Sequence, residues 1–264
     1  MGIPSILFYR FVFSVIFLLP FFIIYAKYTK WSNELLGFLI CTGIFFAITS
    51  MGLIVSYSYI SSGVATTIHF LYPVLTAAIM MYIFNDKKSH IFLIITLLSF
   101  IGVLFLCWTN AGNLNFWGIS YSLITVVTYA LYIVGIDIFE LKKISPLLVT
   151  FCILFVGAII FGIYALSTTG IEPICSPMEW KNLIVLAFFL TVLSDYALIL
   201  AIEFAGSTIS AILGVMEPVI AVCMGVLIFN ELFTAYSAIG LILVLISIVI
   251  AIVLTPEQIT KYYK

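Results

Sequence analysis

Long, uninterrupted runs of apolar residues separated by short polar connections dominate the chain. Each run is about 20 residues long, the length that an α-helix needs to cross about 30 Å of hydrocarbon. Apolar and polar residues do not alternate within the runs, as they would in the roughly 10-residue strands of a membrane β-barrel. The pattern therefore predicts about nine transmembrane helices, over residues 4–26, 34–59, 63–84, 89–108, 115–138, 146–166, 181–203, 207–229 and 234–254.

Composition places these helices in lipid. Hydrophobic residues make up 65% of the 264 residues and charged residues 8%, whereas a soluble domain usually carries about 25% charged residues. The net charge of −1 indicates no nucleic-acid partner. The five cysteines form no CxxC motif and no cluster with histidine, so we predict no metal site and no cofactor.

Basic residues predict the orientation of the chain. They follow alternate helices, so they fall on one side of the membrane, and lysine in short loops is retained in the cytoplasm. We therefore expect a multi-pass protein of the cell (inner) membrane whose tail, residues 255–264, is cytoplasmic. The eight lysines on this side are Lys27, Lys30, Lys87, Lys88, Lys142, Lys143, Lys261 and Lys264.

The chain contains an internal repeat. At an offset of 145 residues Ser62 matches Ser207, Pro73 matches Pro218, and the segment 83–86 matches 228–231. The matching helices are five crossings apart, an odd number, so they run in opposite directions. The predicted fold is thus an all-α integral membrane protein with two inverted-topology repeats, as in secondary transporters. Four helices fall in residues 1–110 and five in residues 111–254.

The two repeats are unequal. The helix predicted over residues 115–138 has no counterpart in the first repeat, and its partner would lie before Met1. We therefore expect that one N-terminal helix is missing from the first repeat. A protein with nine helices by nature is the alternative.

Several motifs resemble those of one family. This family has an arginine early in a helix and a proline at the centre of matching helices, with an acidic residue at the end of each. The last helix of each repeat commonly carries two glycines seven residues apart, and this chain keeps one of them in each repeat. The chain resembles EamA-type transporters of the drug/metabolite transporter superfamily through Phe8–Phe11, Pro73 with Asp86, Glu217–Pro218 with Glu231, Gly102 and Gly240. Members of this family export amino acids and other metabolites or carry nucleotide-like compounds. The resemblance therefore implies two five-helix repeats and transport, without a particular substrate.

Ionisable side chains inside the predicted spans are candidates for transport. Each costs about 2.5–3.5 kcal/mol at a helix centre, so by default it faces a cavity or a partner. Glu217 lies near the midplane, where Pro218 removes a backbone hydrogen bond and kinks the helix. We interpret it as a substrate or proton ligand, with a protonated carboxyl bonded to a neighbour as the alternative.

The equivalent position in the first repeat is Tyr72, before the kink at Pro73, and His69 lies one turn earlier. These two side chains could bind a carboxylate or stack on a ring, or His69 could be a hydrogen-bonded core residue. Asp195 lies midway in its helix and could pair with Glu217 for proton coupling, one carboxyl staying protonated. Arg10, near a helix end, is expected to anchor in the headgroups.

A polar stripe follows the helix predicted over residues 115–138. Its hydroxyl groups must meet protein or water within lipid, so we predict that the stripe lines a cavity. Interhelical hydrogen bonds, worth about 0.6 kcal/mol each, are the alternative. The stripe consists of Tyr121, Thr125, Thr128 and Tyr132, with Tyr129 beside it.

These patterns predict a secondary transporter of small metabolites, an exporter of amino acids or related compounds. Alternating access would rock the two repeats about residues 61–63 and 206–208. HExxH and GxSxG motifs are absent from the sequence, so we do not expect an enzyme. A channel-like or partner-binding membrane subunit is the alternative. A small-molecule substrate and the lipid bilayer are the expected partners, and the sequence leaves a homodimer open.

Overall fold

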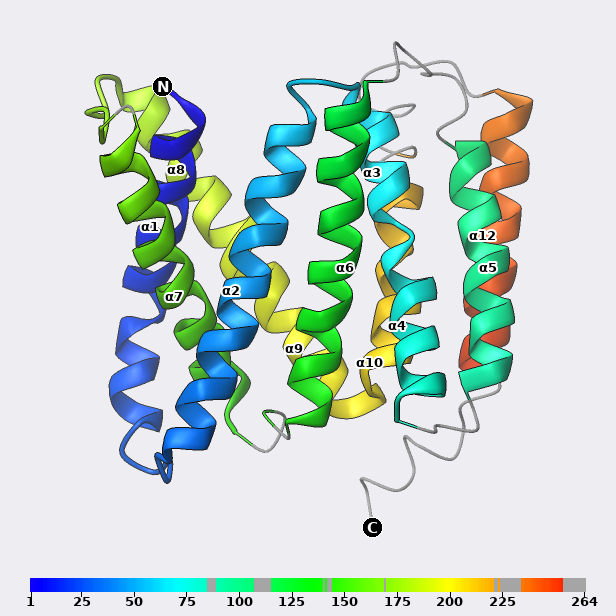
Figure 1. Ribbon diagram of the computed structural model, residues 1–264, viewed down its shortest axis with the longest axis horizontal. Helices are drawn as coiled ribbons and strands as arrows, with labels where there is room; N and C mark the ends of the chain where they lie inside the picture. The colour runs from blue at the N-terminus through cyan, green and yellow to red at the C-terminus, as the bar shows by residue number, and fades with distance from the viewer. Residues whose placement is uncertain are drawn as a thin grey trace. The chain divides into compact units, whose positions relative to one another are not determined.

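The computed structural model describes residues 1–84, 89–106, 115–139, 141, 144–168, 170–220, 223 and 234–253. Regular secondary structure in these ranges is helical, without a strand, as Figure 1 shows. The described part of the chain thus confirms the prediction of an all-α protein.

Six helical stretches are long and apolar enough to cross a membrane, which agrees with a multi-pass membrane protein. Shorter apolar helices cover Leu93–Phe105, Ser207–Ile220 and Ala235–Ala251. The count of nine spans and the inverted topology stay predictions. The six stretches are α1 (Ile3–Tyr25), α2 (Asn33–Ser56), α3 (Ser62–His69) with α4 (Tyr72–Tyr82), α6 (Phe116–Ile138), α7 (Pro146–Ser167), and α8 (Pro177–Ala187) with the π-helix η3 (Phe188–Leu193) and α9 (Ser194–Ala205).

Local sequence signals set where these helices begin. α8 begins at Pro177 rather than at residue 181, because Ser176 and Glu179 form a capping box. The Ser176 hydroxyl accepts from the Glu179 amide, and the Glu179 carboxylate accepts from the Ser176 amide, both at 3.2 Å. The two contacts satisfy amide groups that the first helical turn leaves unpaired.

The chain divides into two compact units. Unit 1 comprises residues 1–51 and 135–203, and unit 2 comprises residues 52–134 and 204–264. Each unit therefore combines segments of both predicted repeats, and the boundaries fall within α2, α6 and α9. The division at residue 110 describes the sequence repeat and stays a prediction.

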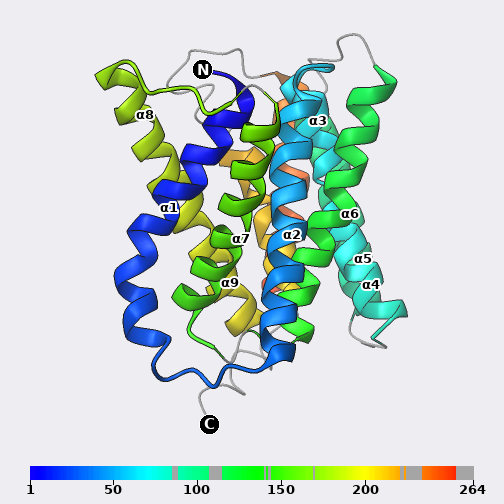
Figure 2. The same ribbon diagram turned by 60° about the vertical axis from the view of Figure 1, so that its left-hand side comes forward.

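In unit 1, α1 packs along α7, beside which it lies in both Figure 1 and Figure 2. The Phe11 and Phe161 rings meet edge to face at 4.8 Å between centroids. A Cβ at Gly157 would collide with the Phe11 ring, so the glycine provides the space that this ring occupies. Small residues allow such close packing where no hydrophobic force drives helices together in lipid.

In unit 2, α5 (Ser89–Leu106) packs on α12 (Ala235–Val253). A Cβ at Gly102 would lie 2.8 Å from Val244 Cγ2 and 3.0 Å from the Gly240 carbonyl oxygen. The two glycines singled out in the sequence therefore meet at one helix crossing. Their lack of side chains lets the backbones approach.

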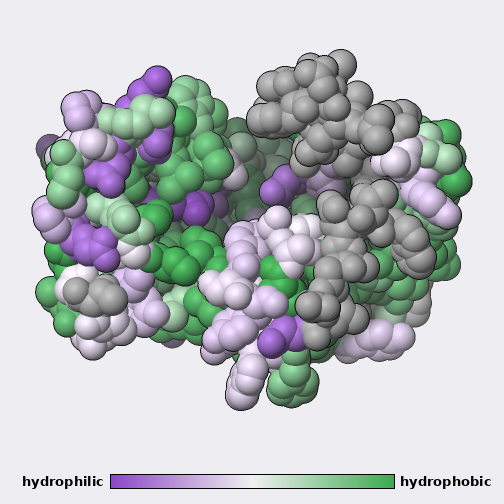
Figure 3. All heavy atoms as spheres, turned by 90° about the horizontal axis from the view of Figure 1, so that it is seen from above, coloured by the Kyte–Doolittle hydropathy of each residue, from purple (hydrophilic) through white to green (hydrophobic). Residues whose placement is uncertain are grey.

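The helices expose large apolar side chains along their sides, for example Ile94, Ile163 and Val249, which are 58–69% exposed. Lipid is the solvent that such side chains require. Figure 3 views the end of the helices near the N-terminus, where hydrophilic side chains gather among hydrophobic ones in the part that carries α1 and α8.

Candidate functional site

The third predicted span is interrupted near its middle. α3 ends at His69, and α4 begins at Tyr72 with Pro73 in its first turn. Proline has no backbone N–H, so Pro73 cannot donate to the carbonyl group of His69 four residues earlier. The Leu71 amide bonds the Ile68 carbonyl at 3.0 Å, which tightens the last turn of α3. The break therefore leaves the His69 carbonyl group without the bond that an uninterrupted helix would provide.

The second repeat is interrupted at the equivalent place. α10 (Ser207–Gly214) ends 145 residues after α3, a turn follows at Val215, and helix resumes over residues 216–220 with Pro218. The offset that aligns the sequences thus also aligns the two ends, since His69 corresponds to Gly214. Pro218 cannot donate to the Gly214 carbonyl, as Pro73 cannot donate to that of His69.

His69 is held by α6. Its Nδ1 lies 2.9 Å from Thr125 Oγ1, and the Thr125 hydroxyl also donates to the Ser122 carbonyl at 2.6 Å. A hydroxyl has one proton, so Nδ1 must be the donor in the first contact. A neutral imidazole with its proton on Nδ1 offers Nε2 as an acceptor. The side chain is 9% exposed, and this bond fixes its orientation.

Aromatic rings surround the imidazole. The His69 ring lies 5.3 Å from Tyr72 and 5.1 Å from Tyr129, measured between centroids. Tyr72 and Tyr129 meet edge to face at 4.6 Å, and Tyr129 stacks on Tyr132 at 5.6 Å. Tyr72 and Tyr132 are buried, whereas Tyr129 is half-buried. Tyr129 therefore forms the more open side of this ring cluster.

Tyr72 also connects α4 with α10. A Cβ added at Gly214 would collide with the Tyr72 hydroxyl, so that hydroxyl lies against the glycine backbone. The charge of Glu217, three residues further along, acts on both Tyr72 and Tyr57. The Glu217 side chain is exposed on the surface of the chain. We call His69, Tyr72, Thr125, Tyr129 and Glu217 the His69 cluster.

The rest of the stripe on α6 has different partners. Tyr121 stacks on Tyr59 at 6.0 Å between centroids, and the Thr128 hydroxyl donates to the Ile124 carbonyl at 3.0 Å. The stripe thus divides: Thr125, Tyr129 and Tyr132 join the ring cluster, and Tyr121 does not. Interhelical hydrogen bonding, the alternative expectation, describes Thr125 well.

Three further hydroxyl groups are buried in unit 2. The oxygen atoms of Thr76 on α4 and of Thr208 and Ser210 on α10 have no hydrogen-bond partner within the described ranges. Buried polar atoms in native proteins are nearly always hydrogen-bonded. The polar surfaces of α4 and α10 therefore favour contact with water or a polar ligand.

A second polar cluster lies in unit 1. Arg10 Nε donates to Thr191 Oγ1 at 2.5 Å, and its Nη2 donates to the Leu190 carbonyl at 3.3 Å. Thr191 lies in the π-helix η3, and its hydroxyl donates to the Leu186 carbonyl at 3.1 Å. Single π-turns within α-helices are frequent at functional sites.

Asp195, one turn beyond Thr191, is 5% exposed and interacts electrostatically with Arg10. Its Oδ2 has no hydrogen-bond partner among the residues described. We call Arg10, Ser14, Thr191 and Asp195 the Arg10 cluster, because Ser14 completes it by donating to the Ala187 carbonyl at 3.1 Å.

Arg10 differs from the expectation of a headgroup anchor. Its guanidinium group turns toward η3, since a cation inside a membrane protein is stabilised by hydrogen-bond acceptors and a carboxyl group. Sequence reasoning did not identify Ser14 as a functional residue. The pair Arg10 and Ser14, four residues apart on an otherwise apolar helix, is the signal that could have revealed this face.

The two predicted carboxyl partners fall in different units, Asp195 in unit 1 and Glu217 in unit 2, so their pairing stays a prediction.

Of the acidic residues in the family motif, Asp86 and Glu231 lie outside the described residues. Within the ranges searched, no three His, Cys, Asp or Glu side chains gather to hold a metal ion.

Comparison with known proteins points to one family. The EamA-like transporter family matches residues 1–108 and 116–253. A solved crystal structure of a protein is similar to the chain with a TM-score of 0.76 and 15% sequence identity, over 96% of this chain and 89% of that one. At that identity the likeness shows a shared fold. No curated protein matches the sequence.

Proposed function

Because this chain belongs to the EamA-like transporter family, we propose that it exports amino acids or related small metabolites from the cell. The family is one of membrane transporters of small molecules, and the apolar helices agree with a multi-pass membrane protein. Apolar or aromatic amino acids are the substrate class that the chemistry of the His69 cluster favours.

The observation that carries this proposal is the arrangement of donors, acceptors and rings at the break between α3 and α4. A neutral His69 with its proton on Nδ1 presents Nε2 as an acceptor, and the carboxylate of Glu217 adds a negative charge. Both suit the ammonium group of an amino acid. The rings of Tyr72 and Tyr129 suit an apolar or aromatic side chain.

Alternating access is the mechanism that the duplicated helix break supports. Secondary transporters built from inverted repeats bind substrate near the midplane, at helices that are interrupted there. α3 and α10 end at equivalent residues, and in each case a proline follows four positions later. In the proposed cycle, the two repeats rock about residues 61–63 and 206–208.

Proton coupling is assigned to the two carboxyl groups inside the apolar spans. Asp195 interacts electrostatically with Arg10, and its Oδ2, which has no hydrogen-bond partner among the described residues, leaves an oxygen atom for a proton. Glu217 interacts electrostatically with Tyr72 and Tyr57. Protonation of either group from one side of the membrane and release to the other would couple export to the proton gradient.

Efflux from an overexpressing strain, screened with amino acids, nucleosides and toxic analogues, tests the substrate class. Purified protein in proteoliposomes then tests the mechanism, because counterflow of labelled substrate distinguishes a carrier from a channel-like subunit. We expect loss of counterflow in His69→Ala and in Glu217→Gln. Tyr121→Phe, outside the ring cluster, is the matched control. Full counterflow in both site variants would contradict the assignment of the site.

A further inference from the structure

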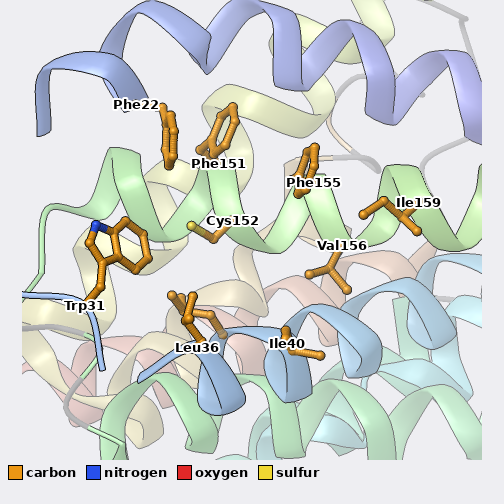
Figure 4. A pocket seen from close by; sticks show the side chains of 10 residues that line it. Phe22, Trp31, Leu36, Ile40, Phe151, Cys152, Phe155, Val156 and Ile159 are labelled. Atoms are coloured by element: carbon orange, nitrogen blue, oxygen red, sulfur yellow. The ribbon is translucent and has the colours of Figure 1, made fainter. Parts of the chain in front are cut away.

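An apolar groove opens between α1, α2 and α7 in unit 1, with a cavity volume of about 480 Å³. Its walls come from three helices and from the α1–α2 connection, as Figure 4 shows. Phe22 and Trp31 line one end, Ile159 lines the other, and Phe151 and Phe155 lie between them on α7. From Phe151 to Ile159, α7 rises about 12 Å at about 1.5 Å per residue.

The groove offers almost no hydrogen bonds to a ligand. Its one N–H side-chain group, the Trp31 indole, donates to the Ala26 carbonyl at 3.2 Å. The remaining lining is hydrocarbon apart from the Cys152 thiol. Phe22 stacks on Phe151 at 4.2 Å and Phe151 on Phe155 at 5.9 Å, which makes one wall a continuous aromatic surface. An apolar occupant is the one that this surface favours.

The groove opens sideways and not toward a polar cluster. Ile40, Phe155 and Ile159 line it and are each 47–48% exposed, so their outer faces meet the hydrocarbon of the membrane. None of the lining residues belongs to the Arg10 cluster. A ligand that arrives from within the bilayer can therefore enter this groove directly.

Positive charge at one end of the groove indicates the head group that the ligand carries. Trp31 lies in the connection of residues 26–32, and its indole donates to the Ala26 carbonyl at the end of α1. The same connection carries Lys27 and Lys30. Both lysines are exposed. Tryptophan is enriched at the membrane–water interface, so this end lies at headgroup depth. Paired lysines there attract anionic lipid, about 1 kcal/mol or fivefold in affinity for each.

We propose that the groove is a binding site for one anionic phospholipid. One acyl chain lies along α7 from Phe151 to Ile159, and the phosphate group lies at Lys27 and Lys30. The site is separate from the proposed substrate site, so its test does not depend on the transported molecule.

Native mass spectrometry of the full chain, released from bilayers that contain equal amounts of phosphatidylglycerol and phosphatidylcholine, tests the proposal. We expect one retained phosphatidylglycerol on the monomer. Lys27→Gln with Lys30→Gln should lower the preference for phosphatidylglycerol roughly 25-fold, because each lysine contributes about fivefold. Lys181→Gln, on α8 and also exposed, is the charge control and should change nothing.

A groove-filling variant tests the acyl-chain half of the site. Ile40→Trp should abolish retention of the lipid, whereas Ile48→Trp, on the same helix and 40% exposed but outside the groove, should preserve it. Equal retention of the two lipids, or retention unaffected by Ile40→Trp in a folded protein, would overturn the proposal. A dimer whose contact covers the groove and excludes lipid would overturn it as well.

Discussion

His69 on α3 and Thr125 on α6 are joined by a hydrogen bond of 2.9 Å, across 56 residues of sequence. This contact between two buried side chains links the interrupted helix to the stripe on α6. It determines which imidazole nitrogen carries the proton, since the Thr125 hydroxyl donates to its own helix. The proposed recognition of an ammonium group depends on it, because the bond leaves Nε2 as the acceptor.

Replacing Thr125 by valine should therefore impair both stability and transport. The imidazole would lose its partner in a buried site, which costs about 1–3 kcal/mol. Thermal unfolding and counterflow measure the two effects. Thr125→Ser keeps the hydroxyl and should retain most of both. If Thr125→Val behaved like the serine variant, the bond would have no role in either property.

Gly52 on α2 leaves the space in which the Thr125 side chain packs. A Cβ at this position would lie 2.8 Å from Thr125 Cγ2, so Gly52→Ala should displace Thr125 and lower the melting temperature. Overpacking of this kind costs about 1–3 kcal/mol. Gly37→Ala on the same helix is the matched control, because nothing lies within 4 Å of its Cβ. That change should be neutral or stabilising, since alanine favours helix by up to about 1 kcal/mol.

Gly214 and Tyr72 should behave as a coupled pair. Gly214→Ala introduces a methyl group where the Tyr72 hydroxyl lies, so it should destabilise the protein in the presence of Tyr72. Tyr72→Phe removes that oxygen atom and should relieve most of the cost of Gly214→Ala. A double-mutant cycle of unfolding free energies measures the coupling, expected at about 0.5–3 kcal/mol. Additive effects would show that the two residues do not touch.

Arg10 and Asp195 offer a second coupled pair, in unit 1. Arg10→Leu removes the cation that interacts electrostatically with the buried Asp195 carboxyl. The two side chains, both among the described residues, form no direct salt bridge, and breaking even a direct buried pair costs about 3–5 kcal/mol. We expect a loss of stability below this range, since the two charges interact without a direct contact and Arg10 is only half-buried. Asp195→Asn in the Arg10→Leu background should restore much of the lost stability. A double variant less stable than either single variant would contradict the pairing.

The inverted topology can be tested by labelling. Asn85→Cys and Asn230→Cys, introduced one at a time into a cysteine-free background, should react with a membrane-impermeant maleimide from opposite sides. These positions lie outside the described residues, so the prediction rests on the 145-residue offset and the loop charges. Labelling of both positions from one side would exclude inverted repeats.

The helices and the family motifs were accessible to sequence reasoning because both are local. The cost of exposing backbone to lipid depends on consecutive residues alone, and the predicted spans match α1, α2, α6 and α7 within three residues at each end. The offset of 145 residues also aligned the ends of α3 and α10. The predicted start of a helix was wrong where a capping box sets it, as at Ser176 before α8.

The sequence by itself thus determined a helical membrane protein, its repeat, and the candidates His69, Tyr72, Asp195 and Glu217. Tertiary structure alone decided which helix faces meet. Arg10 pairs with Thr191 across 181 residues, and α1 lies on α7. In lipid, outward and inward faces are both apolar, so hydrophobicity does not distinguish them, and packing follows small residues and shape instead.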